Sequence, residues 1–130
     1  MAGYTIKALE EIPDVLGDYP GEMRMGAMAL DCEQVAFTWR RMPARTGGKG
    51  SYGHRHREQE EVYFVAEGTL QFKLEDEVLD LSEGTVVRIA PDVVRSVWNE
   101  GPDDAILIMA SRKGDGLGAD VEQVPDFWPE

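Results

Sequence analysis

The fold is decided by residues 48–68, which read GKGSYGHRHREQEEVYFVAEG. This stretch holds both histidines of the chain, His54 and His56, separated by a single residue. On a β-strand, side chains two residues apart face the same side, so both imidazoles are expected to point into one space. Glu61 opens the β-rich run that follows, and a strand continuing around a barrel would aim its carboxylate at the same space.

Two imidazoles and a carboxylate form a ligand set that suits a divalent transition metal with coordination positions left open for substrate or oxygen. The alternative is that both histidines are exposed polar residues of a charged loop, since residues 55–60 read RHREQE. On the His-x-His spacing alone, both interpretations stay open.

Strand and turn signals recur on both sides of this stretch. Residues 35–40 alternate between apolar and other side chains, which is typical of a half-buried strand whose inward residues would be Phe37 and Trp39. Tyr63 and Val65 share a face with Glu61 and are expected in the interior. The other strands are expected at residues 61–66, 69–74, 78–81, 85–89, 95–98 and 105–110. Short strands at this spacing predict an all-β sandwich or barrel.

The 130 residues fit a single domain. We expect a barrel over about residues 35–110, an N-terminal arm over residues 1–34 and a C-terminal tail over residues 111–130. Within the arm, Tyr4–Ile6 is a candidate short strand. The aromatic end of the tail could dock on the barrel or on a partner chain, or it could be loose, and the sequence leaves these alternatives open.

The net charge and the cysteine content argue against some classes of function. The formal net charge is −12, and such a surface repels phosphate backbones and anionic lipid, so we expect no nucleic-acid partner and no membrane partner. An arginine inside a pocket could still attract an anionic small molecule. The single cysteine, Cys32, and the absence of a signal-peptide pattern in residues 1–11 indicate a cytoplasmic protein.

The spacing of Gly48, His54, His56, Glu61 and Gly68 resembles the first sequence motif of the cupin superfamily. The resemblance covers about residues 35–110 and implies a small antiparallel β-barrel of the jelly-roll type. It also implies that two motifs line one mouth of the barrel and that a metal is often bound there. A fold alone does not give a reaction.

The second cupin motif is degraded. Gly84 and Asn99 stand at its two ends with the expected separation. Between them, Ala90 replaces the usual proline, Asp92 replaces a glycine, and Arg95 replaces the histidine that the family uses as a further metal ligand. The resemblance therefore carries over three ligands, and the fourth is missing.

Two outcomes are open at Arg95, because a guanidinium stays protonated and cannot coordinate a metal. Arg95 could pair with Glu61 and replace the metal, which leaves a metal-free pocket lined by His54, His56, Glu61 and Arg95. Alternatively, the three ligands hold the metal and Arg95 binds a carboxylate of the substrate. Tyr63 is the second candidate for substrate binding, although a core role is the simpler interpretation.

These features favour a metal-dependent enzyme of the dioxygenase or isomerase type that acts on a small polar or anionic molecule, with Fe, Mn, Ni or Zn as the metal. The alternative is a module that binds or senses a small ligand without turning it over, and a third reading is a scaffold for dimer assembly. No catalytic acid can be named beyond the ligands. We also expect a homodimer, because residues 4–7 could add as a strand to the sheet of a neighbouring chain.

Overall fold

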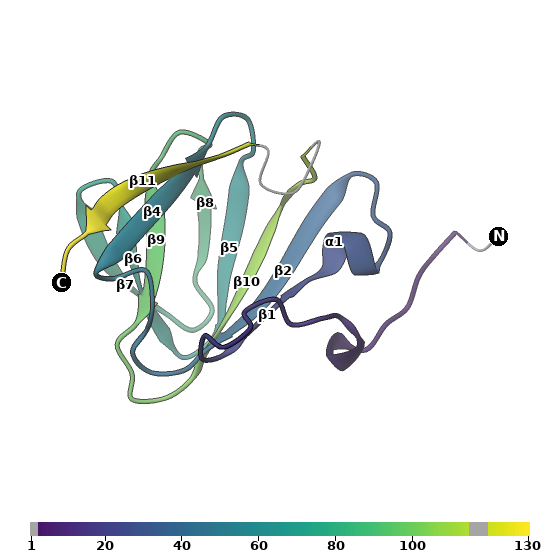
Figure 1. The fold of residues 1–130 in the computed structure, drawn as a ribbon, viewed down its shortest axis with the longest axis horizontal. Helices are drawn as coiled ribbons and strands as arrows, with labels where there is room; N and C mark the ends of the chain where they lie inside the picture. The colour runs from purple at the N-terminus through teal and green to yellow at the C-terminus, as the bar shows by residue number, and fades with distance from the viewer. Residues whose placement is uncertain (1–2, 115–119) are drawn as a thin grey trace.

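The computed structural model describes residues 3–114 and 120–130 of the chain. Two antiparallel sheets face each other and enclose the interior of a barrel (Figure 1), which confirms the all-β prediction. The helical segments are the 3₁₀ turn η1 (Leu9–Glu11) and the single-turn helix α1 (Gly26–Ala29). Across the described residues, no helix has the length and apolar character needed to cross a bilayer.

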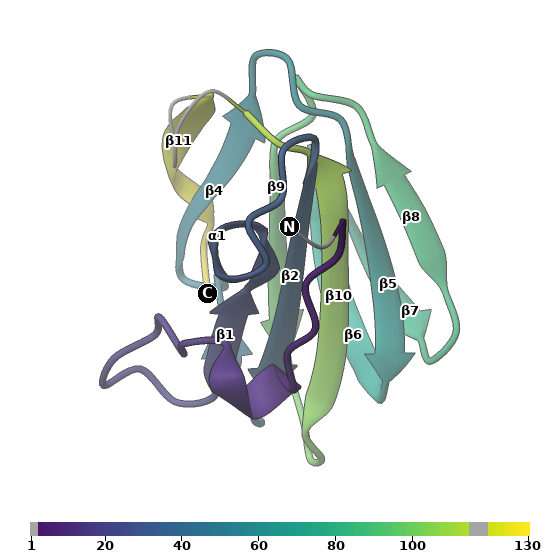
Figure 2. The same cartoon turned by 90° about the vertical axis from the view of Figure 1, so that its right-hand side faces the viewer.

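The first sheet has the strand order β1-β2-β10-β5-β8. Its strands are β1 (Glu22–Met25), β2 (Val35–Met42), β10 (Ala105–Arg112), β5 (Glu61–Glu67) and β8 (Val86–Ile89). Strand β10 lies between β2 and β5, so the C-terminal strand of the predicted barrel joins the strand that precedes the histidines to the strand that follows them (Figure 2).

The second sheet has the strand order β11-β4-β9-β6-β7, and a two-residue strand β3 (Thr46–Gly47) also pairs with β9. Its other strands are β11 (Val121–Trp128), β4 (Ser51–His56), β9 (Arg95–Asn99), β6 (Thr69–Leu74) and β7 (Glu77–Ser82). The strands expected from alternation and turn signals at residues 69–74, 78–81 and 95–98 therefore all lie side by side in one sheet.

The hydrophobic core fills the space between the sheets and draws on both of them. Its buried members are Met42, Tyr63, Val65, Leu70, Phe72, Ile89, Val97, Ala105 and Leu107. The rings of Tyr63 and Phe72 meet edge to face, with their centres 5.9 Å apart, across the two sheets. Tyr63 and Val65 are thus interior residues, as the alternation of β5 predicts.

The prediction that Phe37 and Trp39 are core aromatics is wrong, because β2 turns its other face inward. Met42 is fully buried in the core, and alternation places Arg40 on the same side of the strand. Phe37 instead packs against α1, where a Cβ at Gly26 would lie 3.3 Å from the Phe37 ring. An alternating segment predicts two faces, and which face is buried is decided by the sheet partners.

The sheets extend beyond residues 35–110 at both ends. Strand β1 comes from the expected arm and pairs with β2, and β11 comes from the expected tail and pairs with β4. Tyr4–Ile6, expected as a short strand, has no strand partner and runs outside the barrel (Figure 1). Trp128 at the end of β11 is 4% exposed, so the aromatic tail docks on its own barrel.

Candidate functional site

Three strands bring the predicted site together. Strand β4 carries His54 and His56, β5 begins with Glu61, and β9 begins with Arg95, which is the residue paired with His54 across the sheet. The two imidazole rings meet at nearly a right angle, with their centres 5.1 Å apart. The structure therefore brings all of the predicted ligands and Arg95 into one cluster.

One carboxylate oxygen of Glu61 is the centre of this cluster. Oε1 accepts a hydrogen bond of 2.9 Å from the Tyr63 hydroxyl, and it lies 3.3 Å from Nε2 of His56 and 3.7 Å from Nε2 of His54. Nη2 of Arg95 lies 3.1 Å from the same oxygen. Two histidines, a tyrosine and an arginine thus surround a single acidic side chain.

Arg95 is fully buried, and the backbone fixes its side chain in place. Its Nη1 donates hydrogen bonds to the carbonyl oxygens of Val93 (2.7 Å) and Pro91 (3.1 Å). Its Nη2 lies within ion-pair distance of Glu61, but this contact does not have the geometry of a hydrogen bond. A guanidinium held from two sides in this way cannot swing freely toward a ligand.

The pKa values of the cluster reflect these contacts. Burial by itself would raise the pKa of Glu61, but the neighbouring His54, Arg95, His56 and Tyr63 together hold it below its usual value. Burial lowers the pKa of His56, and the nearby charges of Arg95 and His54 act in the same direction, against Glu61. Glu61 is therefore an anion at neutral pH, while His56 favours its neutral form, as a metal ligand requires.

The donor atoms of His54, His56 and Glu61 lie within 4.8 Å of one another. Ligands about 2.1 Å from a common metal are separated by roughly 3 Å, so a small contraction would let all three donors reach one ion. Both ring nitrogens of the buried His56 lack a hydrogen-bond partner among the described residues, which leaves Nε2 available to a metal. The three donors fit a metal, and the charge of Arg95 beside them opposes it.

Sequence reasoning missed Asp120, which stands behind His56. Its Oδ2 lies 3.6 Å from Nδ1 of His56, on the side of the ring away from Glu61. The carboxylate also accepts hydrogen bonds from the backbone N–H groups of residues 57–59, and these lower its pKa against the opposing effect of burial. The contact with Nδ1 is within ion-pair distance but is not a hydrogen bond, and a small shift would bring the carboxylate to the place from which it can orient a ligating imidazole. No short-range signal could link residues 56 and 120, because only the pairing of β11 with β4 brings them together.

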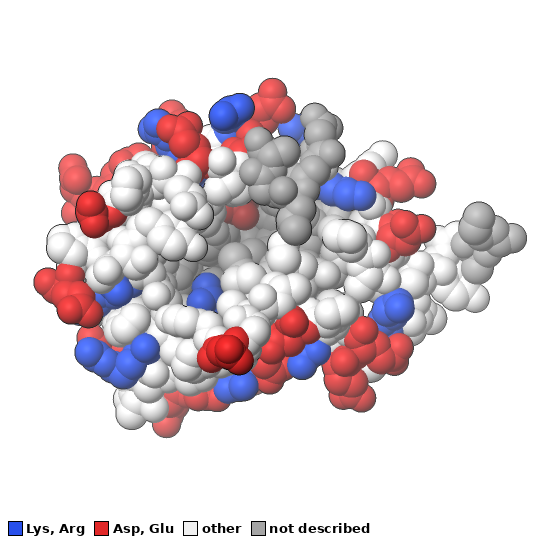
Figure 3. Space-filling model, in the orientation of Figure 1, with Lys and Arg blue, Asp and Glu red and all other residues white. Residues whose placement is uncertain are grey.

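A cavity of about 580 Å³ lies between the two sheets, next to the cluster. Its wall includes His54, Tyr63 and Arg95, together with residues of the first sheet and of the loop before β4. Tyr52 lines it as well, whereas Arg45, in the loop before β4, is not part of the wall and pairs with Glu100. Figure 3 shows a hollow near the centre of one face of the molecule, bordered mostly by uncharged side chains, with a Lys or Arg side chain beside it.

A family model described as "Cupin domain" matches residues 42–111. The chain belongs to the cupin domain family. Solved structures show the same double-stranded β-helix fold. A cupin protein from Bacteroides fragilis is 19% identical with a TM-score of 0.68, and the match covers 95% of this chain and 100% of that one.

Two further structures have a TM-score of 0.67. A predicted oxalate decarboxylase from Thermotoga maritima is 18% identical, and the match covers 83% of this cupin and 98% of that chain. KdgF from Halomonas sp. is 14% identical, with 85% and 96% covered. No curated protein matches this cupin in sequence. At these identities the structures show a shared fold and not a shared activity.

Asn99, at the end of the second motif, has a structural role in this cupin. Its buried side-chain amide donates to the carbonyl oxygens of Met42 and Asp103, and its Oδ1 accepts from the N–H of Gly101. It therefore secures the turn between β9 and β10 and lies apart from the cluster around Glu61.

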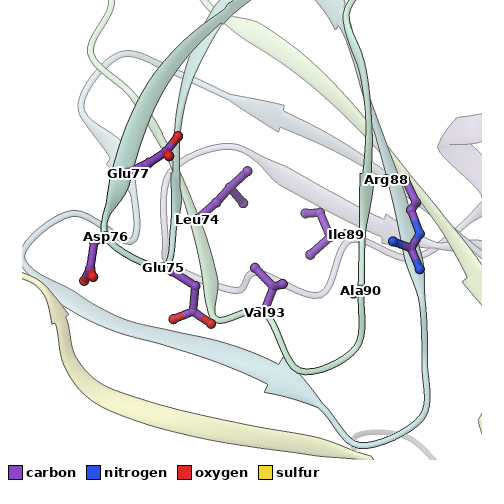
Figure 4. A pocket seen from close by; sticks show the side chains of 8 residues that line it. All are labelled: Leu74, Glu75, Asp76, Glu77, Arg88, Ile89, Ala90 and Val93. Carbon is purple, nitrogen blue, oxygen red and sulfur yellow. The ribbon is translucent and has the colours of Figure 1, made fainter.

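A second pocket, of about 530 Å³, lies away from the histidines (Figure 4). The acidic turn at residues 75–77 lines one side, Arg88 lines the other, and Leu74, Ile89 and Val93 lie between them. Its wall includes none of the residues around Glu61. Acidic side chains on a turn are common without a ligand, so the cavity beside His54 is the candidate site.

Proposed function

We propose that this cupin binds a small organic molecule in the cavity between the sheets and acts on it with a divalent metal held by His54, His56 and Glu61. The observation that carries the proposal is the convergence of three ligand atoms beside a cavity that His54 itself lines. A two-histidine, one-carboxylate set leaves coordination positions open, which suits a reaction of the dioxygenase or isomerase type. The metal would polarise the molecule or bind oxygen at those positions.

The residues of the chain have defined parts in this proposal. Glu61 supplies the one negative charge of the ligand set, and Asp120 orients His56 from behind. Tyr63 donates a hydrogen bond to Glu61, and burial raises the pKa of its hydroxyl, so Tyr63 stays protonated and positions the carboxylate. Side chains of the core cluster and its neighbours, Tyr63, Val97, Leu107 and Met109, also line the cavity.

A second candidate is a metal-free binding module, and the ion pair between Arg95 and Glu61 favours it. The guanidinium already supplies a positive charge 3.1 Å from the carboxylate oxygen that a metal would need. In this alternative, the ion pair of Arg95 and Glu61 forms a polar wall with the two imidazoles. This wall binds a ligand but does not catalyse a reaction. The two candidates differ in metal content.

The test is elemental analysis of untagged protein, followed by a competitive titration with Fe²⁺, Mn²⁺, Ni²⁺ and Zn²⁺. We expect about one metal ion per chain and its loss in His54→Ala, because two protein ligands are too few for a tight site. Arg57→Ala is the matched control, since this exposed neighbour lies outside the ligand set. Wild-type protein that binds no metal would exclude the metal-dependent reaction and leave the binding module.

A further inference from the structure

Two consecutive arginines of β2 have opposite surroundings. Arg41 lies on the outer face, where Nε is 3.0 Å from Glu22 and Nη1 is 3.1 Å from Asp104. Arg40 has the opposite orientation and lines the cavity, together with Met23 and Leu107, the residues paired with it on β1 and β10. Alternation along the strand thus sends one guanidinium to the surface and the other into the barrel.

Arg40 has no compensating charge among the described residues. No hydrogen bond or ion pair joins its side chain to any residue of the part of the chain that the structure describes, and its Nε is buried without a partner. Burial lowers the pKa of Arg40, which only the hydroxyls of Tyr19, Tyr63 and Tyr52 oppose. A guanidinium still remains protonated, so a positive charge faces the cavity without an anion. Such a charge lowers the stability of the folded protein unless an anionic ligand pairs with it.

The wall of the cavity offers no anion to complete it. Among the described residues that line the cavity there is no Asp or Glu, although the whole chain carries a net charge of −12. Arg95 also lines the cavity, but Glu61 and two backbone carbonyls already bind its guanidinium. One uncompensated positive charge therefore remains, and it belongs to Arg40.

We propose that Arg40 is the anchor for the carboxylate of a small monocarboxylic acid, whose other end faces His54. The planar fork of a guanidinium matches a carboxylate in two parallel hydrogen bonds. Arg40 comes from the first sheet and His54 from the second, so a molecule held between them spans the cavity. This inference rests on the proposed function for the role of the cavity, and it names the class of molecule that the cavity takes.

Charge and shape favour a monocarboxylate over a phosphate. A phosphate ester carries close to two charges at neutral pH, and the described wall supplies one uncompensated cation. Although Ser51, Ser96 and His54 also line the cavity, much of its wall is apolar or aromatic, from Leu16, Met23, Val97, Leu107 and Met109 and from three tyrosines. These side chains suit the hydrocarbon or aromatic body of an organic acid.

The experiment is calorimetric titration of the protein as purified with benzoate and hexanoate. Their neutral amides, benzamide and hexanamide, test the need for charge, and inorganic phosphate tests the alternative anion. The variants are Arg40→Met, which removes the charge at similar volume, and Arg40→Gln, in case the first variant folds poorly. Arg41→Met is the matched control, because it removes the adjacent arginine from the outer face.

We expect at least one of the two acids to bind the wild type, more than ten times as tightly as its amide. Arg40→Met and Arg40→Gln should each lose about 30-fold in affinity, the effect of one charged hydrogen-bonding partner, and Arg41→Met should lose less than threefold. Without ligand, Arg40→Met should melt at a higher temperature than the wild type, because it removes an uncompensated charge. Wild type that binds neither acid, amides that bind as well as acids, tighter binding of phosphate, or unchanged affinity in the Arg40 variants would each overturn the proposal.

Metal analysis of the same protein samples separates this inference from the proposed function. If the metal proposal fails, the protein holds no metal but still binds the acid in a way that depends on Arg40. If the Arg40 inference fails, the protein still binds metal, but the acids no longer bind more tightly than their amides. The two failures therefore give different results.

Discussion

At the scale of single residues, the pair of Glu61 and Arg95 decides how readily the site can hold a metal. Arg95 stands where the cupin motif has a histidine, and its guanidinium is fully buried while the Glu61 side chain is 13% exposed. Breaking a buried charge pair by removing one partner is costly, because the other charge stays without compensation. The same pair that stabilises the metal-free barrel thus competes with a metal for the carboxylate.

The first prediction concerns this competition. Arg95→His should tighten metal binding by roughly two orders of magnitude, because it removes a like charge a few ångströms from the ion and adds an imidazole. Competitive titration of the wild type and the variant measures the gain. Arg88→His, on the surface beside Glu60, is the control and should leave metal affinity unchanged. Equal affinities of wild type and Arg95→His would show that the guanidinium does not limit the site.

The second prediction compares two adjacent glutamates. Glu61→Gln should lower the free energy of unfolding of the metal-free protein by about 3 kcal/mol, because Arg95 is left buried and unpaired. Glu60→Gln should change it by less than about 1 kcal/mol, since Glu60 pairs with Arg88 at the surface. Urea denaturation in the presence of a chelator gives both values. Similar losses in the two variants would mean that the buried pair contributes little.

At the scale of elements, the last strand holds the site strand in place. Strand β11 pairs with β4 from Val121 opposite His56 to Val124 opposite Gly53. Gly53 is required there, because a Cβ would lie 2.4 Å from the Phe127 ring. The ammonium group of Lys73 also lies over the Phe127 ring, 3.8 Å from its centre. The segment expected as a tail is therefore part of the wall that presents the histidines.

The third prediction tests this role of β11. Trp128→Ala should lower the free energy of unfolding by about 3 kcal/mol, the usual cost of truncating a buried aromatic side chain. Val121→Ala, on the same strand but 36% exposed, is the control and should cost less than about 1 kcal/mol. Chemical denaturation followed by fluorescence measures both variants, with circular dichroism to allow for the lost tryptophan. A loss in Trp128→Ala no larger than in Val121→Ala would contradict the docked strand.

The elements differ in how well their sequences predict them. Strands β5 to β10 follow from alternation and turn residues, because these strands have a clear buried face and short connections. Strand β11 could not be predicted, since Pro125 and the positive φ of Asp126 interrupt its alternation. Arg40 was also missed, because an arginine in an alternating segment is normally assigned to the solvent face. The inward orientation is seen only in the folded structure, where Arg40 lines the cavity together with its strand partners Met23 and Leu107.

At the scale of the whole molecule, the N-terminal segment extends away from the barrel (Figure 1). Tyr4 is 73% exposed and Ile6 is 83% exposed, so their apolar surfaces have no partner within the described chain. A homodimer in which this segment adds to the neighbouring sheet would cover them. The dimer remains a prediction.

The fourth prediction is a measurement of this association. Sedimentation at micromolar concentration should give a dimer, and deletion of residues 1–8 should weaken it by at least tenfold. The double variant Tyr4→Ser/Ile6→Ser should have the same effect if these side chains carry the contact. Met28→Ser, which is 79% exposed on α1, is the control and should leave association unchanged. A monomeric wild type would refute the dimer, and a dimer that tolerates the deletion would place its interface elsewhere.

The contact between Asp120 and His56 has a consequence for the protonation of the imidazole. The Asp120 carboxylate, 3.6 Å from Nδ1, favours a proton on that nitrogen, whereas the Glu61 carboxylate, 3.3 Å from Nε2, favours a proton on the other. The two carboxylates therefore compete for the tautomer of His56, and a metal bound at Nε2 would leave the proton to Nδ1 and Asp120. Because three backbone N–H groups of the loop after β4 hold Asp120, its carboxylate is in position before any ion or substrate arrives. A residue near the C-terminal end of the sequence thus provides a proton acceptor for a histidine 64 positions earlier, and this acceptor becomes decisive when a metal occupies Nε2.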